Sequence, residues 1–161
     1  MRAMAARIEL RPALAEDADF LRAVYGSTRE DELAPTGWTR EQKDWFIAQQ
    51  FHAQDTYYKQ HYDGATYDVV LVDGEPAGRL YVARWDDEIR IMDIALLPPF
   101  RGQGIGERLL EPLLREGAES GRTVSIHVEQ TNRAKSLYER LGFVEVGEHG
   151  VYKLMRWTPP S

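Results

Sequence analysis

The amino-acid sequence predicts an α/β fold whose mixed, mostly antiparallel β-sheet is flanked by helices on both faces. Three observations lead to this prediction: helical apolar spacing near both ends of the chain, strand-like alternation in its centre, and a glycine-rich segment that joins the central strands to a helix. A length of 161 residues suits one domain, and the sequence contains no internal repeat or linker. We therefore assign residues 1–161 to a single domain.

The N-terminal part of the chain predicts one strand followed by two helices. Residues 7–12 alternate between apolar and polar side chains, as a short strand does, and residues 15–25 carry an apolar stripe at helical spacing. No good N-cap residue precedes this first helix. The second helix has a clearer start, because Thr39 and Gln42 have the spacing of a capping box, and we expect it to run through Phe51 into an aromatic, polar stretch.

The centre of the chain predicts an antiparallel meander of three strands. Residues 69–72, 77–84 and 88–97 have strand-like patterns, and the tight turn Asp-Gly-Glu-Pro at 73–76 joins the first two. The proline pair 98–99 ends the third strand, because proline cannot donate a hydrogen bond to the sheet.

The C-terminal part predicts a helix, a strand, a short helix and a closing hairpin. Isoleucine and leucine form a stripe over residues 105–114, and Pro112 is expected to remove one hydrogen bond from this helix and bend it. Residues 123–128 alternate as a strand, residues 133–141 form a short helix, and a hairpin spans residues 143–155. We expect a cleft where the third meander strand parts from the strand over residues 123–128.

The composition excludes several classes of protein. The chain has 20 basic and 26 acidic residues, a formal net charge of −6, which is the wrong sign for a protein held to nucleic acid or anionic lipid by its overall field. Because cysteine is absent, disulfides, thiolate metal sites and a covalent thiol nucleophile are excluded. The sequence shows no secretory segment and no stretch long enough to cross a bilayer, so we expect a cytoplasmic protein with no nucleic-acid or membrane partner.

Several other kinds of site lack their motifs. The glycine-rich segment has no lysine in the position that a Walker-type nucleotide site requires. It also does not match the dinucleotide-binding fingerprint, and no parallel strand–helix–strand unit with an acidic residue at its second strand follows convincingly. The chain has no nucleophile elbow of the G-x-S-x-G type. Four histidines lack metal-ligand spacing, so we expect no metal; these are His52, His61, His127 and His149.

The glycine loop at residues 101–106 is the most informative motif. Its glycines permit a tight turn that points consecutive N–H groups inward, and the residues that follow begin a helix. The free N–H groups and the dipole at a helix start favour an anion, so a phosphate or pyrophosphate is the natural occupant.

Two motifs resemble those of a known family. Arg101, Gly104 and Gly106 have the spacing of the acyl-CoA pyrophosphate loop of the GNAT superfamily of N-acyltransferases, which has Arg or Gln, two residues, Gly, one residue, and Gly or Ala. Residues 132–143 resemble the later family helix, with Asn at its start, Leu-Tyr in its middle and Gly-Phe at its end. The predicted order of elements also fits, and the resemblance spans roughly residues 8–157.

The resemblance implies a set of cofactor contacts for acetyl-CoA. The backbone N–H groups of the loop would bind the pyrophosphate, and they belong to Arg101, Gly102, Gln103, Gly104, Ile105 and Gly106. The pantetheine arm would lie along Ile94, Ala95 and Leu96 like an additional strand, and a backbone N–H there would polarise the thioester carbonyl. Asn132 is expected to cap its helix or to contact the cofactor.

The resemblance also implies direct acetyl transfer to a primary amine, without an acyl-enzyme. Tyr138 occupies the family's usual acid position and would protonate the departing thiolate; alternatively, it only packs against the cofactor. The base is less determined. Asp93 is the first candidate, acting through a water, because an acid in an apolar strand is costly unless it is used or paired. Glu129 and His127 are the next candidates.

The acceptor stays open between small-molecule amines and the amines of peptides or proteins. The first two helices are expected to shape its pocket, and the acidic run 30–32 would border it or is simply solvated. Arg108, Arg133 and Lys135 could neutralise the ADP end of the cofactor locally. The alternative function is a non-catalytic acyl-CoA-binding or sensor module. The sequence leaves acyl-chain preference open and is compatible with a monomer or a homodimer.

Overall fold

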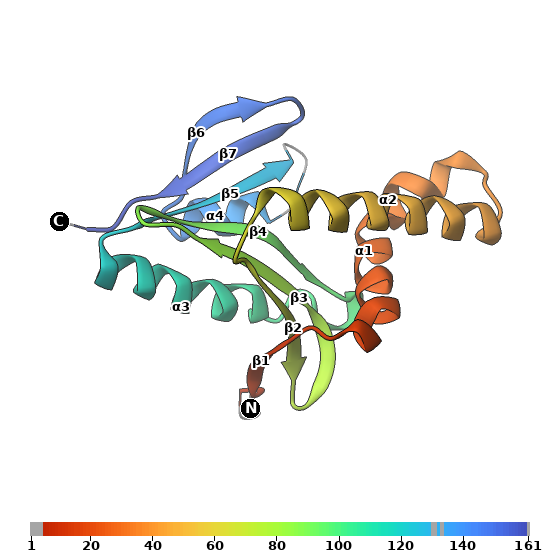
Figure 1. Ribbon diagram of the computed structural model, residues 1–161, viewed down its shortest axis with the longest axis horizontal. Helices are drawn as coiled ribbons and strands as arrows, with labels where there is room; N and C mark the ends of the chain where they lie inside the picture. The colour runs from red at the N-terminus through yellow and green to blue at the C-terminus, as the bar shows by residue number, and fades with distance from the viewer. Residues whose placement is uncertain (1–4, 130–131, 133, 161) are drawn as a thin grey trace.

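The computed structural model describes residues 5–129, 132 and 134–160, whose order of elements is the predicted one (Figure 1). The strands are β1 (Ile8–Pro12), β2 (Thr66–Val72), β3 (Glu75–Arg84), β4 (Glu88–Leu96), β5 (Thr123–Glu129), β6 (Val144–His149) and β7 (Tyr152–Trp157). The α-helices are α1 (Ala18–Leu33), α2 (Arg40–His61), α3 (Ile105–Ser120) and α4 (Lys135–Arg140). Short 3₁₀ turns η1 (Ala15–Asp17), η2 (Ala34–Thr36) and η3 (Pro98–Phe100) lie between them.

The strands form one seven-stranded sheet in the order β1-β2-β3-β4-β5-β7-β6. Each neighbouring pair is antiparallel except β4 and β5, which are parallel. The predicted mixed, mostly antiparallel sheet is therefore confirmed. Because α3 connects β4 to β5, these elements form a parallel strand–helix–strand unit, which the sequence patterns did not reveal.

β4 and β5 part halfway along their length. They pair only over residues 88–91 and 123–126. Just beyond, the β3–β4 register jumps from Val82–Ile91 to Tyr81–Asp93, so Met92 is an extra residue in β4. Such a β-bulge bends its strand and redirects the side chains that follow. The second half of β4 thus leaves β5, at the place where the sequence predicted that the strands part.

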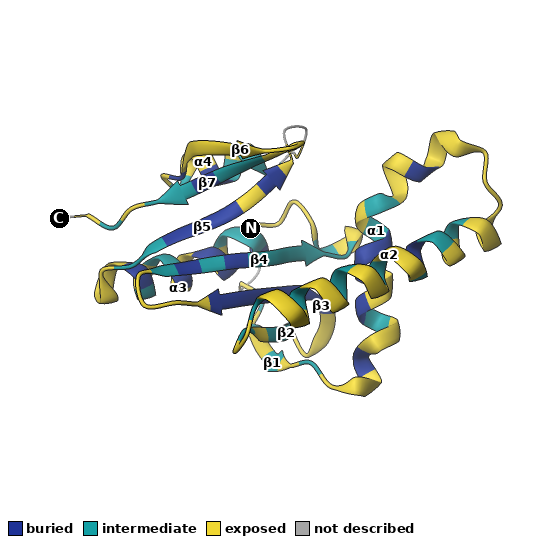
Figure 2. Cartoon of the chain, turned by 45° about the horizontal axis from the view of Figure 1, so that its top comes forward, coloured by how far each residue is buried: buried dark blue, intermediate teal, exposed yellow. Residues whose placement is uncertain are grey.

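The two faces of the sheet are covered differently (Figures 1 and 2). Alternate residues of the strands pack with α3 and α4 in the main core, which includes Leu80, Leu110 and Val124. A fully buried aliphatic side chain such as Leu110 contributes about 1.5–3 kcal/mol to stability. On the opposite face, Tyr81 packs edge-on against Tyr58 of α2. The α1–α2 connection extends beyond the sheet in both views.

No described side chain caps the first turn of α1, and the charged side chain of Asp17 instead holds the segment that leads into the helix. Asp17 accepts the Leu14 N–H at 2.7 Å, and Arg11 donates to both of its carboxylate oxygens at 2.8 Å. The Arg11 hydrogen bonds, together with the Leu14 N–H, lower the pKa of Asp17 to about 2. The helix also runs to Leu33, beyond the predicted end at residue 25.

The other helices differ only in detail from the prediction. The Thr39–Gln42 capping box is confirmed: Thr39 Oγ1 accepts the Gln42 N–H at 3.1 Å, and Gln42 Oε1 accepts the Thr39 N–H at 2.9 Å. α3 runs unbroken through the exposed Pro112. Arg133, the predicted first residue of the short helix, lies outside the described residues, and α4 begins at residue 135.

Candidate functional site

The glycine loop has the backbone that an anion site needs. Gly102 and Gly104 have φ angles of +72° and +79°, in the left-handed region that only glycine adopts without strain. Gly104 is the N-cap of α3, so the N–H groups of the first turn of α3 have no acceptor within the helix. Loop and helix together present N–H donors and a positive dipole end at one corner of the fold.

Three contacts hold this loop in place through Arg101 and Gln103. Arg101 Nε donates to the Leu96 carbonyl at 2.8 Å, and Nη2 donates to Ser27 Oγ of α1 at 3.2 Å. Gln103 Nε2 donates to the Pro99 carbonyl at 2.7 Å. The Arg101 N–H is also engaged, because it donates to the Pro98 carbonyl at 3.2 Å. Of the six predicted N–H donors, this one already has an acceptor within the turn.

Beside the loop lies an unpaired edge of β4. Ile94, Ala95 and Leu96 pair with β3 on one side only, since β4 and β5 have no register beyond residue 91 in the described part of the chain. An extended chain can add to such an edge by main-chain hydrogen bonds. The Leu96 carbonyl is taken by Arg101, and alternate residues of a strand present their backbone groups to the same edge, so Ile94 is the freer position on this edge.

Tyr138 reaches this region from α4. Its side chain is only 4% exposed and packs edge-on against Phe143. Burial and the nearby Asp93 charge raise the pKa of the Tyr138 phenol, so it stays protonated as a donor throughout the physiological range. The structure therefore brings the two predicted catalytic residues within electrostatic reach of each other.

Asp93, directly after the bulge, is held by residues of two other elements. Its Oδ2 accepts Arg79 Nη2 at 2.7 Å and the Tyr58 hydroxyl at 3.2 Å. Arg79 Nη2 also donates to Gln54 Oε1 at 2.8 Å. Sequence reasoning expected Asp93 to be used or paired but missed its partners. The rule applied to Asp93 would have found Arg79, a charge in the middle of the apolar strand β3.

The other proposed bases lie along β5. His127 and Glu129 are exposed on the face of the sheet that also carries Ser125. Burial, followed by the charges of Arg90 and His149, lowers the pKa of His127. Glu129 is close enough to contribute to the raised pKa of Tyr152. Among the described residues, no hydrogen bond or ion pair to a buried side chain fixes either the Glu129 carboxylate or the His127 imidazole.

The remaining predicted residues have structural contacts. Asn132 Oδ1 accepts the Ala134 N–H at 2.8 Å, so it caps the turn before α4. Lys135 Nζ lies 3.5 Å from Glu145 Oε1, and the side chain of Arg108 is exposed. In the acidic run 30–32, Glu30 pairs with Arg40 and Glu32 with Arg29.

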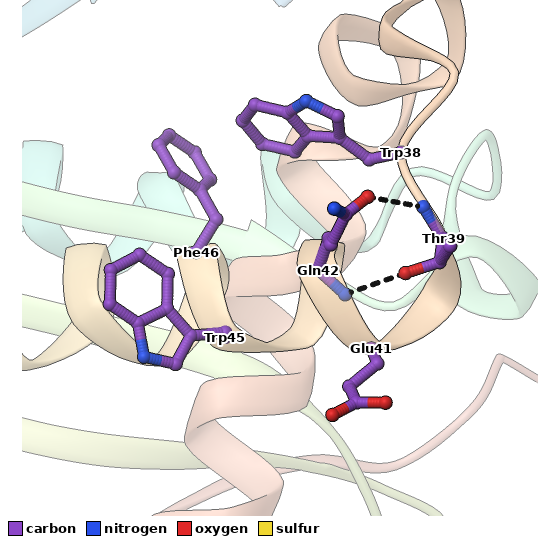
Figure 3. A pocket seen from close by; sticks show the side chains of 6 residues that line it. All are labelled: Trp38, Thr39, Glu41, Gln42, Trp45 and Phe46. Carbon is purple, nitrogen blue, oxygen red and sulfur yellow. Dashed lines mark hydrogen bonds between the residues drawn. The ribbon is translucent and has the colours of Figure 1, made fainter.

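An open hollow of about 680 Å³ lies elsewhere, at the start of α2 (Figure 3). Its lining residues are Trp38, Thr39, Glu41, Gln42, Trp45 and Phe46. None of them belongs to the glycine loop, the β4 edge or the Asp93 contacts, so this hollow does not mark the candidate site. Within the described residues, no group of three or more His, Cys, Asp or Glu could hold a metal, and no helix is long and apolar enough to cross a membrane.

Comparisons with known proteins agree with this geometry. Over 61 residues the chain is 41% identical to a [ribosomal protein bS18]-alanine N-acetyltransferase of Haemophilus influenzae, covering 37% of this chain and 42% of the relative. It is 31% identical over 163 residues to a mycothiol acetyltransferase of Nocardiopsis dassonvillei, covering 84% of this chain and 45% of the relative. The chain thus spans less than half the length of these curated relatives.

Solved structures show the same fold. The crystal structure of a PaiA N-acetyltransferase from Thermoplasma acidophilum in complex with coenzyme A has a TM-score of 0.69 at 18% identity, covering 94% of this chain and 99% of that one. The ribosomal-protein-S18-alanine N-acetyltransferase of Escherichia coli has a TM-score of 0.61 at 20% identity, covering 96% of both chains. The sequence profile described as "Acetyltransferase (GNAT) domain" matches residues 36–159. The chain belongs to the GNAT family of acetyltransferase domains.

Proposed function

We propose that the protein is an N-acetyltransferase that transfers the acetyl group of acetyl-CoA directly to a primary amine. The observation that carries the proposal is the unpaired edge of β4 beside a loop of free N–H groups at the start of α3. Such a pair of features suits a ligand with a diphosphate at one end and an amide-bearing arm at the other. Membership of the GNAT family supports the same reaction.

The loop and the β4 edge would hold acetyl-CoA. The N–H groups of residues 102–106 would bind the pyrophosphate, and the backbone groups of Ile94 and the Leu96 N–H would pair with the amides of the pantetheine arm. When bound, acetyl-CoA supplies the activated acetyl thioester. A backbone N–H of the β4 edge would stabilise the charge that develops on the thioester oxygen.

In the proposed reaction, the amine nitrogen attacks the thioester carbonyl carbon, a C–N bond forms and the C–S bond breaks. Asp93 would take a proton from the amine through a water, and Tyr138 would give its proton to the departing thiolate. The raised pKa of Tyr138 makes its phenol a weaker acid, but desolvation in the same site also makes a thiolate more basic. The absence of cysteine is consistent with direct attack rather than a cysteine acyl-enzyme.

We propose that the acceptor is a small-molecule or peptide amine. The name of the Haemophilus relative, a ribosomal-protein alanine N-acetyltransferase, supports including peptide N-termini. The net charge of −6 favours a cationic amine over an anionic acceptor. A cytoplasmic location and a monomeric or homodimeric state remain part of the proposal.

Calorimetry with acetyl-CoA and an amine panel test this function. The panel contains an Ala-starting pentapeptide, a lysine peptide, spermidine and free amino acids, and thiol release is followed over time. We expect acetyl-CoA to bind and at least one amine to release thiol. Absence of acetyl-CoA binding contradicts the proposal, whereas binding without turnover of any amine indicates the non-catalytic sensor instead.

A matched pair of glycine variants makes the binding test specific. Gly104→Ala and Gly64→Ala both place a Cβ on a left-handed residue, with φ angles of +79° and +75° and no neighbouring atom within 4 Å. Both should lose about 1 kcal/mol of stability from backbone strain. Only Gly104→Ala should weaken acetyl-CoA binding, by about tenfold or more, because only its loop faces the diphosphate.

A further inference from the structure

Arg79 is a buried cation at the meeting point of four elements. Its side chain is 2% exposed. Its guanidinium carbon lies 4.9 Å from the ring centre of Tyr81 on β3 and 5.7 Å from that of Tyr25 on α1. It also contacts Gln54 on α2 and Asp93 on β4. The elements expected to form the acceptor side therefore converge on one guanidinium group.

Stability alone does not account for this arrangement. Removing two charges from water costs free energy that their attraction often does not recover, so an apolar pair of similar volume would fill the space as well. Moreover, Arg79 Nε is buried without a hydrogen-bond partner in the described part of the chain, which is itself unfavourable. The ion pair needs another explanation, and its position beside the parted strands suggests one.

The hydrogen bonds fix only one oxygen of Asp93. Arg79 and Tyr58 both donate to Oδ2, whereas no hydrogen bond from a described residue reaches Oδ1. The Asp93 side chain is 16% exposed, so it is accessible although its partner is not. The bulge at Met92 sets the backbone from which this side chain leaves the strand.

We propose that Arg79 is a positioning residue for acetyl transfer: it anchors the Asp93 carboxylate through Oδ2, so that Oδ1 stays available to the acceptor amine or to its water. This proposal rests on the proposed function, in which Asp93 is the base. Tyr58 and Gln54 assist by holding Oδ2 and the guanidinium from α2.

Arg79 is the one cation among the described groups that interact with Asp93. The others are the phenols of Tyr81 on β3, Tyr58 on α2 and Tyr138 on α4. Burial raises the pKa of each phenol, so all three stay neutral. Removing Arg79 would leave the Asp93 carboxylate with neutral partners only among the described residues, and only the Tyr58 hydroxyl would still hold Oδ2.

The test follows Asp93 directly by NMR in protein with ¹³C-labelled aspartate, where the signal that disappears in Asp93→Asn identifies it. We expect the Asp93 carboxyl signal to shift in Arg79→Met, because Oδ2 loses a hydrogen-bond donor, and to return most of the way in Arg79→Lys, which restores a cationic donor. Tyr58→Phe should give a smaller shift in the same direction. The control is Arg84→Met. It breaks another ion pair of β3, in which Arg84 Nε lies 2.7 Å from Glu116 Oε2, and it should leave the Asp93 signal unchanged.

Kinetics test the consequence with an Ala-starting pentapeptide and spermidine as acceptors, whose amines have different pKa values. In Arg79→Met, kcat/KM at pH 7 should fall about 100-fold for both acceptors, and the KM for acetyl-CoA should stay within about twofold. Arg79→Lys should recover about tenfold of that loss.

The outcomes separate this proposal from the proposed function. If Arg79→Met and Arg79→Lys both leave the Asp93 carboxyl signal where it is, the positioning role is overturned, whatever the activity. If the signal moves but Asp93→Asn retains wild-type kinetics, the role of Asp93 as base fails instead. Should Arg79→Met not fold, Arg79→Lys and Tyr58→Phe decide, because an unchanged Asp93 signal in both overturns the proposal.

Discussion

The two sides of the parted strands are built in different ways. On the α3 side, backbone conformation defines the site: left-handed glycines, the free N–H groups of a helix start and the unpaired edge of β4. On the α1–α2 side, side-chain charge defines it: Arg79 of β3 and Tyr58 of α2 both donate to Asp93 of β4. A backbone site is sensitive to Cβ atoms and tolerant of side-chain identity, and a charge site has the opposite sensitivity. Binding of acetyl-CoA and reaction with the acceptor should therefore respond to different mutations.

The largest expected effect is on the backbone side, at Gly78 of β3. A Cβ at this position would lie 2.1 Å from the Ala95 carbonyl oxygen and 3.0 Å from Leu96 Cα, so β4 must move. Gly78→Ala should lower the free energy of unfolding by about 3 kcal/mol, measured by urea denaturation. Gly147→Ala is the control, because no atom lies within 4 Å of its Cβ position. Equal losses in both variants would show that β4 yields easily at this contact.

Tyr138→Phe is expected to have the next largest effect, on kcat rather than on folding. Removing the phenol should lower kcat about 10–100-fold if it protonates the thiolate. The ring of Tyr138 still packs against Phe143, so stability and the KM for acetyl-CoA should change little. Steady-state kinetics at saturating acceptor measure this effect. Wild-type kcat in Tyr138→Phe would leave Tyr138 as a packing residue and remove the acid from the mechanism.

The backbone side was also the more predictable one from sequence. Glycine spacing between a strand and a helix restricts the backbone locally, so residues 101–106 were identified without any tertiary contact. The Thr39–Gln42 capping box was predictable for the same reason. The bulge at Met92 and the parallel pairing of β4 with β5 depend on neighbours far along the chain. Neither was predicted from the sequence, although the parting of the two strands was.

The charge side was predicted in part. Asp93 stood out because a carboxylate in an apolar strand needs a use or a partner. Its partners were missed, because Tyr58 lies 35 residues away and Arg79 lies 14 residues away, on other elements. The role of Asp17 at the start of α1 was missed as well, since Arg11 comes from the preceding strand. Side-chain charge acts through tertiary contacts, so a local pattern can single out Asp93 or Arg79 as a charge in an apolar strand but cannot show which residues contact it.

Asp17 offers a test of charge away from the site. Its pKa is lowered to about 2 by Arg11, so the folded state releases a proton that the unfolded chain, with a pKa of about 3.9, still binds. The stabilisation is therefore complete above pH 5 and is lost as the pH falls from about 4 to 2. Asp17→Asn should cost about 1–2 kcal/mol at pH 7 and almost nothing at pH 2, by urea denaturation at each pH. If Asp17→Asn lowers the free energy of unfolding by the same amount at every pH, the Leu14 hydrogen bond rather than the charge stabilises the start of α1.

The smallest expected effect is on stability, from removing the hydroxyl of Tyr67 on the α1–α2 side. The Tyr67 ring packs edge-on against Tyr81, the neighbour of Arg79, at a centroid distance of 4.9 Å. Its hydroxyl is buried without a partner among the residues that the structure describes. Tyr67→Phe removes this unsatisfied group and keeps the ring, so it should raise the free energy of unfolding by up to about 1 kcal/mol and leave kcat unchanged. A loss of stability would reveal a hydrogen bond to that hydroxyl, and a loss of kcat at unchanged stability would show that the hydroxyl itself supports the charge site.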